Sequence, residues 1–237
     1  MLRAAWTERV PRLSSHLVAV REVTLSDAPT LFDLLADPAV AEHLASPPPS
    51  VTAFAGFIGW SQDQRTQGNG VCFGIVPHGL EEAVGIIQVR ALEPSLFAAE
   101  WGFAIGNAFW STGVFVEAAN LVADFAFTKM KVDRLEARVV NQNGRGHAVL
   151  QKLGARAEGT LARAFRKHGR VDKQLLWSLR HDDWRQRPLL HQRLSAAEAA
   201  EQIARAIQET RTFEANTRRH PVHRATPYPF FLTESKD

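Results

Sequence analysis

The hydrophobic and polar positions in the first part of the chain follow the two periods that distinguish strands from helices. Residues 17–24 alternate apolar and polar side chains, as a half-buried strand does. A short helix is expected next, because Ser26-Asp27 is suited to cap it, leucines follow at helical spacing, and Pro38 ends it. A second short helix is expected at 39–45, before the break formed by Pro47-Pro48-Pro49.

The pattern after this break predicts a longer series of elements. In chain order they are a helix of about fifteen residues capped by Ser50, strands at 71–77, 83–91 and 97–105, a helix from about 113 to 129, a strand at 134–140, a helix at 144–153, and strands at 157–166 and 172–180. Glycine and charged residues separate the first three of these strands, which favours an antiparallel meander. The mixture of strands and helices predicts an α/β or α+β fold with a mixed sheet.

The composition divides the chain into three parts. Residues 1–16 are expected to be an irregular lead-in, 17–184 a single domain, and 185–237 a polar tail rich in Arg, Gln, Glu and His. The tail has a narrow apolar stripe on a predicted helix of about twenty residues, formed by Ala196, Ala199, Ala200, Ile203 and Ile207. This helix either packs back on the domain or contacts a partner, such as a second copy in a homodimer; the sequence leaves both open.

Charge and cysteine content exclude several classes of protein. Hydrophobic residues make up 45% of the 237 residues and charged residues 22%, so the chain can bury a core. A net charge of +3 without a long Lys/Arg run argues against a nucleic-acid partner and is compatible with an anionic cofactor. The one cysteine, Cys72, lies in an apolar run and is expected in the core, so no disulfide framework, Cys-based site or other metal centre is predicted.

No membrane or secretion signal is expected either. The N-terminus lacks an apolar signal-peptide core, and no apolar stretch reaches the roughly 20 residues that a membrane span needs. The sequence therefore predicts a cytoplasmic protein with no membrane partner.

The segment Trp110-Ser111-Thr112-Gly113-Val114-Phe115 is a candidate anion site. A strand that ends near Ile105 leads through a short loop into a helix, whose first backbone N–H groups lack intrahelical partners and carry partial positive charge. A pyrophosphate is well held at such a point, Gly113 allows close approach, and Ser111 and Thr112 offer hydroxyl donors. Many helices begin in this way, so the segment alone does not identify a ligand.

The surrounding segments resemble, in order, the GNAT acyltransferase superfamily, and most closely its RimJ/RimL-like branch. The matched segments are Ala99 to Gly106, Phe109 to Ala119, Asp133 to Arg138, Asn141 to Ala155, and Glu158-Gly159. The resemblance spans about residues 17–184. It implies the GNAT fold, a central and mostly antiparallel sheet flanked by helices, here followed by a C-terminal helical tail.

The resemblance also implies a function and a set of site residues. Acetyl-CoA serves as the co-substrate, and an acetyl group passes directly to a primary amine, most simply a protein N-terminal α-amine. The residues implied in cofactor binding are Phe103, Ala104, Ile105, Trp110, Ser111, Thr112, Gly113, Val114, Phe115 and Asn143. Glu100 is the expected general base, although a strand carboxylate that simply pairs with an arginine is the alternative.

Three departures from the family pattern keep other functions open. Phe115 stands where the family prefers Gly or Ala, Gly146 stands in place of Ser, and the only tyrosine is Tyr228 in the tail. A small-molecule amine acetyltransferase and a non-catalytic acyl-CoA-binding or interaction module are therefore alternatives. His147 is expected on a helix surface.

Arginines and lysines raise two further possibilities. One or two of the arginines near the cofactor segments are expected to meet the CoA phosphates: Arg134, Arg138, Arg145 and Arg156. A basic patch around the last hairpin would favour an acidic acceptor if it bordered the acceptor site: Arg163, Arg166, Lys167 and Arg170.

Overall fold

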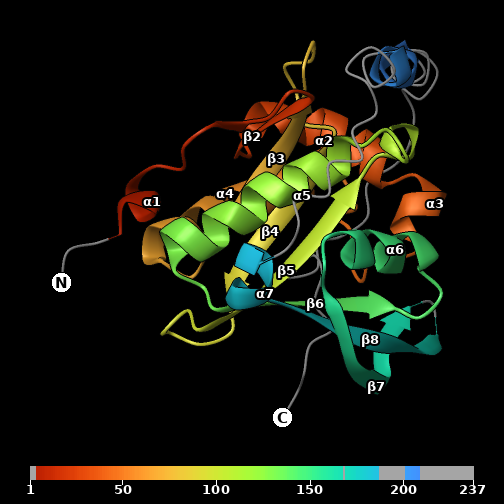
Figure 1. Cartoon of the computed structure of the whole chain (residues 1–237). Helices are drawn as coiled ribbons and strands as arrows, with labels where there is room; N and C mark the ends of the chain where they lie inside the picture. The colour runs from red at the N-terminus through yellow and green to blue at the C-terminus, as the bar shows by residue number, and fades with distance from the viewer. Residues whose placement is uncertain (1–3, 168, 187–200, 209–237) are drawn as a thin grey trace.

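An eight-stranded mixed sheet forms the centre of the computed structural model, which describes residues 4–167, 169–186 and 201–208 (Figure 1). The strands are β1 (Leu13–Ser14), β2 (Val18–Glu22), β3 (Gly70–Pro77), β4 (Gly85–Ala91), β5 (Ala98–Ile105), β6 (Arg134–Val140), β7 (Arg156–Lys167) and β8 (Arg170–Arg180). Their order is β1-β2-β3-β4-β5-β6-β8-β7, and β5 and β6 form the parallel pair among antiparallel neighbours. The expected mixed and mostly antiparallel sheet is confirmed.

Helices cover both faces of this sheet. They are α1 (Ala5–Glu8), α2 (Ala28–Leu35), α3 (Pro38–Ala41), α4 (Val51–Gln67), α5 (Val114–Phe125), α6 (Gly144–Lys152) and α7 (His181–Gln186), with short 3₁₀ segments η1 (Leu25–Asp27) and η2 (Asn107–Phe109). α5 continues into a π-helical turn, η3 (Ala126–Met130), so the helix expected at 113–129 is present with an irregular last turn. The other predicted strands and helices of residues 17–180 are present within a few residues of their expected bounds.

Local sequence signals account for several of the helix ends. Ser50 accepts a hydrogen bond from the Ala53 N–H and so caps α4, and Gly68 ends that helix with a φ of 82° in the left-handed region. Asp27 does not cap α2 in the expected way. Its fully buried carboxylate accepts instead from Thr24 N–H at 2.8 Å and from both Arg21 terminal nitrogens at 2.7 and 2.8 Å.

The lead-in is more ordered than the sequence predicted. Residues expected to be irregular form α1 and β1, and Trp6 is 5% exposed within the main hydrophobic cluster. The pattern of apolar and polar residues in 1–15 is too short to predict these elements. They are held in place because β1 pairs with β2 and because one large ring, that of Trp6, is buried.

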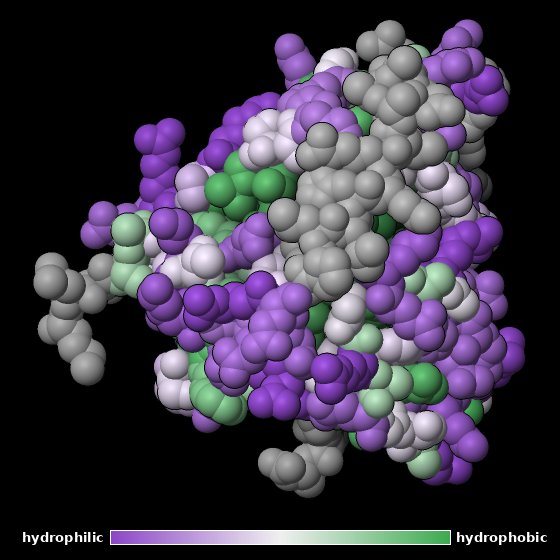
Figure 2. All heavy atoms as spheres, viewed as in Figure 1, coloured by the Kyte–Doolittle hydropathy of each residue, from purple (hydrophilic) through white to green (hydrophobic). Residues whose placement is uncertain are grey.

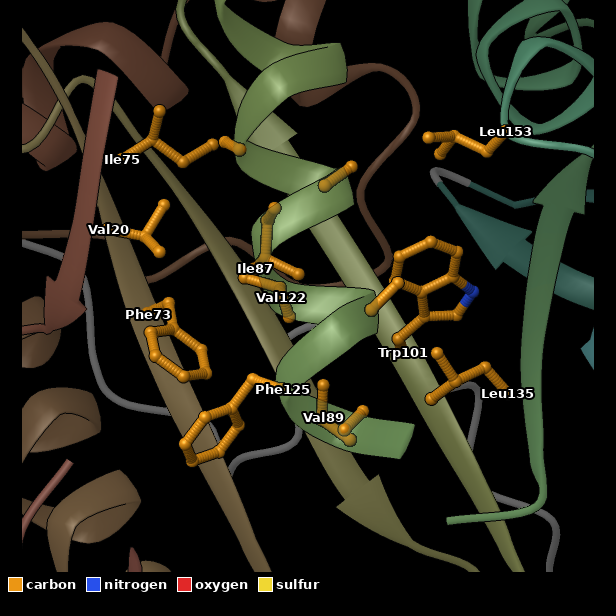
Figure 3. Close-up of a cluster of buried hydrophobic side chains, with 14 of the residues drawn as sticks. Val20, Phe73, Ile75, Ile87, Val89, Trp101, Val122, Phe125, Leu135 and Leu153 are labelled. Carbon is orange, nitrogen blue, oxygen red and sulfur yellow. The ribbon is translucent and has the colours of Figure 1, made fainter. Parts of the chain in front are cut away.

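The sheet separates the core into two layers. On one face, α5 packs across β3 and β4, and the rings of Phe73 and Phe125 meet edge to face with centroids 5.2 Å apart (Figure 3). On the other face, α2 and α4 cover a second cluster that contains Phe57, Ile86 and Cys72. Cys72 is 1% exposed and its burial raises the pKa of the thiol, which confirms the expectation of a core cysteine.

The two central strands separate part-way along their length. β5 pairs with β6 only from Ala98 to Glu100, opposite Arg134 to Glu136. Beyond that point β5 stays paired with β4 as far as Ile105, while β6 stays paired with β8 as far as Val140. Each half of the sheet therefore keeps its own partners, and a wedge opens between β5 and β6 on the carboxyl side of Glu100.

A short helical segment of the tail packs on the folded domain. In residues 201–208, Ile203 and Ala206 are 5% and 3% exposed and belong to the α5-face cluster. This supports the interpretation that the tail helix packs back on the domain. Ile207, also in the predicted stripe, is partly buried against the same cluster. The other stripe residues, Ala196, Ala199 and Ala200, lie outside the described residues, as does Tyr228.

The α5 face of the molecule is mainly hydrophilic, with hydrophobic residues in separate patches (Figure 2). Among the residues that the structure describes, no helix combines the length and the hydropathy that crossing a membrane requires.

Candidate active site

A cleft of about 1140 Å³ occupies the wedge between β5 and β6. Its walls are the part of β5 after Glu100, the part of β6 after Glu136, the beginnings of α5 and α6, and the residues that follow α3. Because a drug-sized ligand fills a pocket of roughly 300–1,000 Å³, this cleft has room for a larger ligand or for two molecules together.

The free edge of β5 forms one wall. Phe103, Ala104 and Ile105 line the cleft and pair with β4 on their other side, so no strand covers the edge that faces β6. Backbone N–H and C=O groups on such an edge can pair with an extended ligand, as they do with an added strand. The positions of these three residues agree with the cofactor contacts that the sequence predicted.

The loop before α5 has the geometry of an anion site. Gly113 has a φ of 84° and Ser111 a φ of 64°, both in the left-handed region, and both residues line the cleft. The first intrahelical bond runs from Glu117 N–H to Gly113 C=O, so helix geometry leaves the preceding N–H groups without an intrahelical acceptor. These groups and the helix dipole favour a negative charge at this end of the cleft.

Thr112 and Val114 do not line the cleft, in contrast to their neighbours. The Thr112 hydroxyl donates to the Phe109 carbonyl at 2.8 Å and accepts from Val114 N–H at 3.4 Å, and Thr112 is only 4% exposed. Val114 is fully buried in the α5-face cluster. These two side chains hold the loop in shape, and the hydroxyl predicted as a ligand donor is used internally.

Trp110 and Arg145 form a bridge at the cleft. The Arg145 guanidinium at the start of α6 lies 4.1 Å from the centroid of a Trp110 ring in the loop before α5. Of the four arginines considered, three are bound to carboxylates: Arg134 to Glu136 and Glu158, Arg138 to Glu100, and Arg156 to Asp183. Arg145 has no carboxylate partner within the described residues, so it is the arginine of this set that remains available to a phosphate.

Glu100 lies at the point where the two strands part. It is 6% exposed, lines the cleft, and contacts Arg90 at 3.2 Å and Arg138 at 3.4 Å. Burial raises the pKa of Glu100 above its ordinary value, while Arg138 and Arg90 oppose part of that rise. The carboxylate is thus both paired with arginine and open to the cleft. It therefore has the features of both interpretations from the sequence, a general base and a strand carboxylate that pairs with an arginine.

Phe115 turns toward β5. Its ring centroid lies 4.8 Å from that of Phe103, and both rings are half-buried against the α5-face cluster. The large side chain therefore packs along the cleft wall, next to Gly113 but directed toward the sheet.

Asn143 and Gly146 shape the opposite wall. The Asn143 side-chain oxygen accepts from Gly146 N–H at 2.9 Å and caps α6. A Cβ on residue 146 would lie 2.9 Å from Asn143 Nδ2 and 3.0 Å from Val139 Cγ1, which explains glycine at this position. Asn143 lines the cleft; His147 does not, since its Nδ1 accepts from the Trp177 ring N–H at 3.0 Å.

Among the lining residues that the sequence did not predict are His43, Phe165 and Gln174. They come from the segment after α3 and from β7 and β8, so only the tertiary fold brings them to the cleft. Burial lowers the pKa of His43, with Arg145 and Lys167 lowering it further and Glu42 opposing. The lowered pKa favours the neutral imidazole.

The basic patch of the last hairpin does not border the cleft. None of Arg163, Arg166, Lys167 and Arg170 is among the residues that line it. Lys167 instead reaches back to α3, where its ammonium donates to the carbonyls of Ala41 and Leu44. The patch thus gives no support to an acidic acceptor.

In the described ranges, no three His, Cys, Asp or Glu side chains gather in a way that would hold a metal ion.

The chain is similar in sequence to known proteins. Residues 18–156 match the family model of the acetyltransferase (GNAT) domain. The chain is 26% identical over 168 residues to the uncharacterized N-acetyltransferase p20 of Bacillus licheniformis, a match that covers 70% of this chain and 94% of that protein. It is 31% identical over 113 residues to the probable N-acetyltransferase YjcK of Bacillus subtilis, over 47% of this chain and 62% of that protein.

Solved structures show the same fold. Mycobacterium smegmatis RimJ in complex with CoA-disulfide has a TM-score of 0.67 at 24% identity, over 86% of this chain and 98% of that chain. The ribosomal-protein-S5-alanine acetyltransferase of Vibrio fischeri has a TM-score of 0.65 at 18% identity, over 76% of this chain and all of that one, 100%. Since a single family model spans the parting strands, the loop before α5 and all of α6, the chain belongs to the GNAT acetyltransferase family.

Proposed function

We propose that this protein is an acetyl-CoA-dependent N-acetyltransferase that passes an acetyl group directly to a protein N-terminal α-amine, as expected for a RimJ/RimL-like member of the family. The observation that carries the proposal is the cleft between β5 and β6, with an unpaired strand edge on one side and the beginning of α5 at one end. The structural likeness to RimJ and to a ribosomal-protein acetyltransferase supports the choice of a protein α-amine.

The chain offers a plausible binding group for each part of acetyl-CoA. The free edge at Phe103 to Ile105 suits the amides of the pantetheine arm, and Asn143 stands across the cleft from it. Ser111, Gly113 and the first turn of α5 would hold the pyrophosphate, with the Arg145 guanidinium close to the same loop. The size of the cleft fits this occupant together with an acceptor.

Glu100 is the base in this proposal. A carboxylate with a raised pKa takes a proton from an ammonium, directly or through a water molecule, more readily than an ordinary one. The neutral amine then attacks the thioester carbonyl, and a backbone N–H on the free edge of β5 stabilises the oxyanion. As the tetrahedral intermediate collapses, the attacking nitrogen gives up its remaining extra proton and the leaving thiolate takes it, directly or through water in the open cleft, so the proposal needs no tyrosine as general acid.

The departures that suggested a non-catalytic module have structural explanations. Phe115 packs on Phe103 along the wall, and Gly146 is set by close contact with Asn143 and Val139. Neither residue closes the cleft. A catalytic role therefore accounts for the site better than a binding role alone, and a small-molecule amine remains the alternative acceptor that the test must distinguish.

Calorimetry with acetyl-CoA and turnover on a panel of amines test the proposal. Gly113→Asp should weaken acetyl-CoA binding by about tenfold or more, because it adds negative charge beside the pyrophosphate. Gly113→Asn is the matched control, since Asn has nearly the same shape and tolerates the left-handed region. Equal affinity of the Asp and Asn variants would place the pyrophosphate elsewhere. Turnover of small amines but of no peptide would favour the alternative acceptor.

A further inference from the structure

Gln174 is a buried side chain with an unused hydrogen-bonding atom. The residue is 3% exposed and lines the cleft from β8. Its side-chain oxygen, Oε1, is the one buried side-chain nitrogen or oxygen in the described part of the chain without a hydrogen-bond partner. Buried polar groups in folded proteins are nearly always paired, and an unpaired one opposes folding. An amide kept at this cost points to a partner outside the chain.

The sheet register places Gln174 on the same face as Glu100. Gln174 lies opposite Val140 in the antiparallel β6–β8 pair, and Glu100 lies opposite Glu136 in the parallel β5–β6 pair. Side chains of paired residues share a face, and so do residues two or four apart on one strand. Glu100, Arg138 and Gln174 therefore all belong to the face turned away from α5.

The groups around Gln174 do not suit a polycation. On this face of the cleft, Arg138 and Arg90 already pair with the carboxylate of Glu100. On this face, an ammonium group would meet two arginines and a carboxylate that they already pair. An uncharged polar group is the better match for this wall of the cleft.

An amide side chain has a specific complement. It offers one acceptor, the oxygen, and donors on its nitrogen, and the assignment of the two atoms can exchange by a half-turn of the side-chain amide. A peptide group offers the matching N–H and C=O. A protonated alkylamine group, such as the further ammonium groups of a polyamine, offers donors only and leaves the amide N–H donors of Gln174 without an acceptor.

We propose that Gln174 binds the first peptide group of the acceptor, so that the site selects amines followed directly by an amide bond over polyamines and other alkylamines. This inference rests on the proposed function, because it names the acceptor class for the same cleft. Gln174 acts in it as a substrate-binding residue, while proton removal stays with Glu100.

Gln174→Leu removes the amide and keeps the approximate size of the side chain. We expect kcat/KM for a short peptide with a free alanine N-terminus to fall about tenfold or more, while the Kd for acetyl-CoA changes less than about twofold. The matched control is Gln142→Leu, the same change at an exposed residue outside the cleft, which should leave both constants near wild type. Thermal unfolding separates binding from structure: the Gln174→Leu protein should be at least as stable as wild type, because it loses an unpaired buried atom.

An ester analogue of the peptide, in which oxygen replaces the first peptide N–H, gives the decisive comparison. Wild type should use the ester less well than the peptide, and Gln174→Leu should no longer distinguish them. Equal peptide turnover by Gln174→Leu and wild type would overturn the inference and leave the proposed function intact. Preferential acetylation of a polyamine such as spermidine would overturn the inference and would also favour the small-molecule acceptor over the proposed one.

A measurement of peptide binding tests the inference independently of catalysis. If wild type acetylates no amine, calorimetry of the same peptide with the CoA-saturated protein still decides: binding that Gln174→Leu abolishes supports the inference while the proposed function fails. Absence of peptide binding overturns both.

Discussion

Glu100 combines two features that rarely occur together in one carboxylate. It contacts two arginines, yet its pKa is raised, because burial has a larger effect than both ion pairs. The two arginines hold the carboxylate in one orientation, and burial still favours its protonated form. An exposed ion pair would fix the carboxylate but make it a weaker base. The position at the parting of β5 and β6 therefore supplies both the orientation and the basicity that a general base needs.

Replacing Glu100 by Gln should separate catalysis from stability. We expect kcat/KM to fall about 100-fold or more, which is the usual contribution of a positioned base. In wild type, kcat/KM should fall as pH is lowered through the raised pKa of Glu100, and Glu100→Gln should lose this acid limb. Glu93→Gln, the same change at an exposed carboxylate outside the cleft, is the control and should keep the wild-type pH profile. An unchanged pH profile in Glu100→Gln would remove Glu100 from the role of base.

The effect on stability follows from the same pKa. A carboxyl whose pKa is higher in the folded than in the unfolded state binds more protons when folded, so stability falls as pH rises between the two values. The ionised Glu100 is thus a net cost at neutral pH. Glu100→Gln should then unfold in urea at the same or a higher concentration than wild type at pH 7, despite its lost activity.

At the scale of elements, the beginnings of α5 and α6 depend on each other through Trp110 and Arg145. Stacking of a guanidinium on an indole ring is worth about 0.5–2 kcal/mol, and here it spans two helices that border the same cleft. Arg145→Ala should weaken CoA binding by about tenfold, because it removes both the stacking and a cation near the proposed phosphate site. Arg145→Lys should lose less, since it keeps the charge but not the planar contact.

Salt and a second arginine provide the checks for this prediction. Measured by calorimetry at low and high ionic strength, the loss caused by Arg145→Ala should be larger at low salt. Arg156→Ala removes an exposed arginine that is paired with Asp183 outside the cleft, and its affinity for CoA should match wild type. If Arg145→Ala and Arg156→Ala lost CoA affinity equally, the loss would reflect a general effect of net charge and not a local contact.

The sequence predicted the elements well because their limits depend on local chemistry. Ser50 and Gly68 bound α4 through a cap and a left-handed turn, and both signals are visible in a few residues. The parting of β5 and β6 depends on which strands pair beyond Glu100 and Glu136, and no local pattern encodes that choice. The family resemblance supplied the loop before α5, whereas His43 and Gln174 became site residues only through contacts between distant segments.

At the scale of the whole molecule, the described part of the tail contributes buried side chains to the hydrophobic core of the domain. Ile203 and Ala206 lie three residues apart on one side of the 201–208 segment, and both are buried in the cluster that also contains Val122 and Trp101. The neighbours Gln202 and Ala204 are exposed. This one-sided burial is what an amphipathic helix shows when it packs on a domain.

Ile203→Ala should therefore lower the stability of the entire domain. Deleting a buried isoleucine side chain costs about 2–5 kcal/mol, and for a chain of this size each kcal/mol shifts Tm by roughly 2–4 °C. We expect the Tm to fall by at least about 4 °C in a single cooperative transition, because the segment belongs to the main core. Gln202→Ala, a truncation on the exposed side, should leave the Tm unchanged. If Ile203→Ala left the Tm in place but changed the molecular mass in solution, the stripe would serve a contact between two copies and not the core of one.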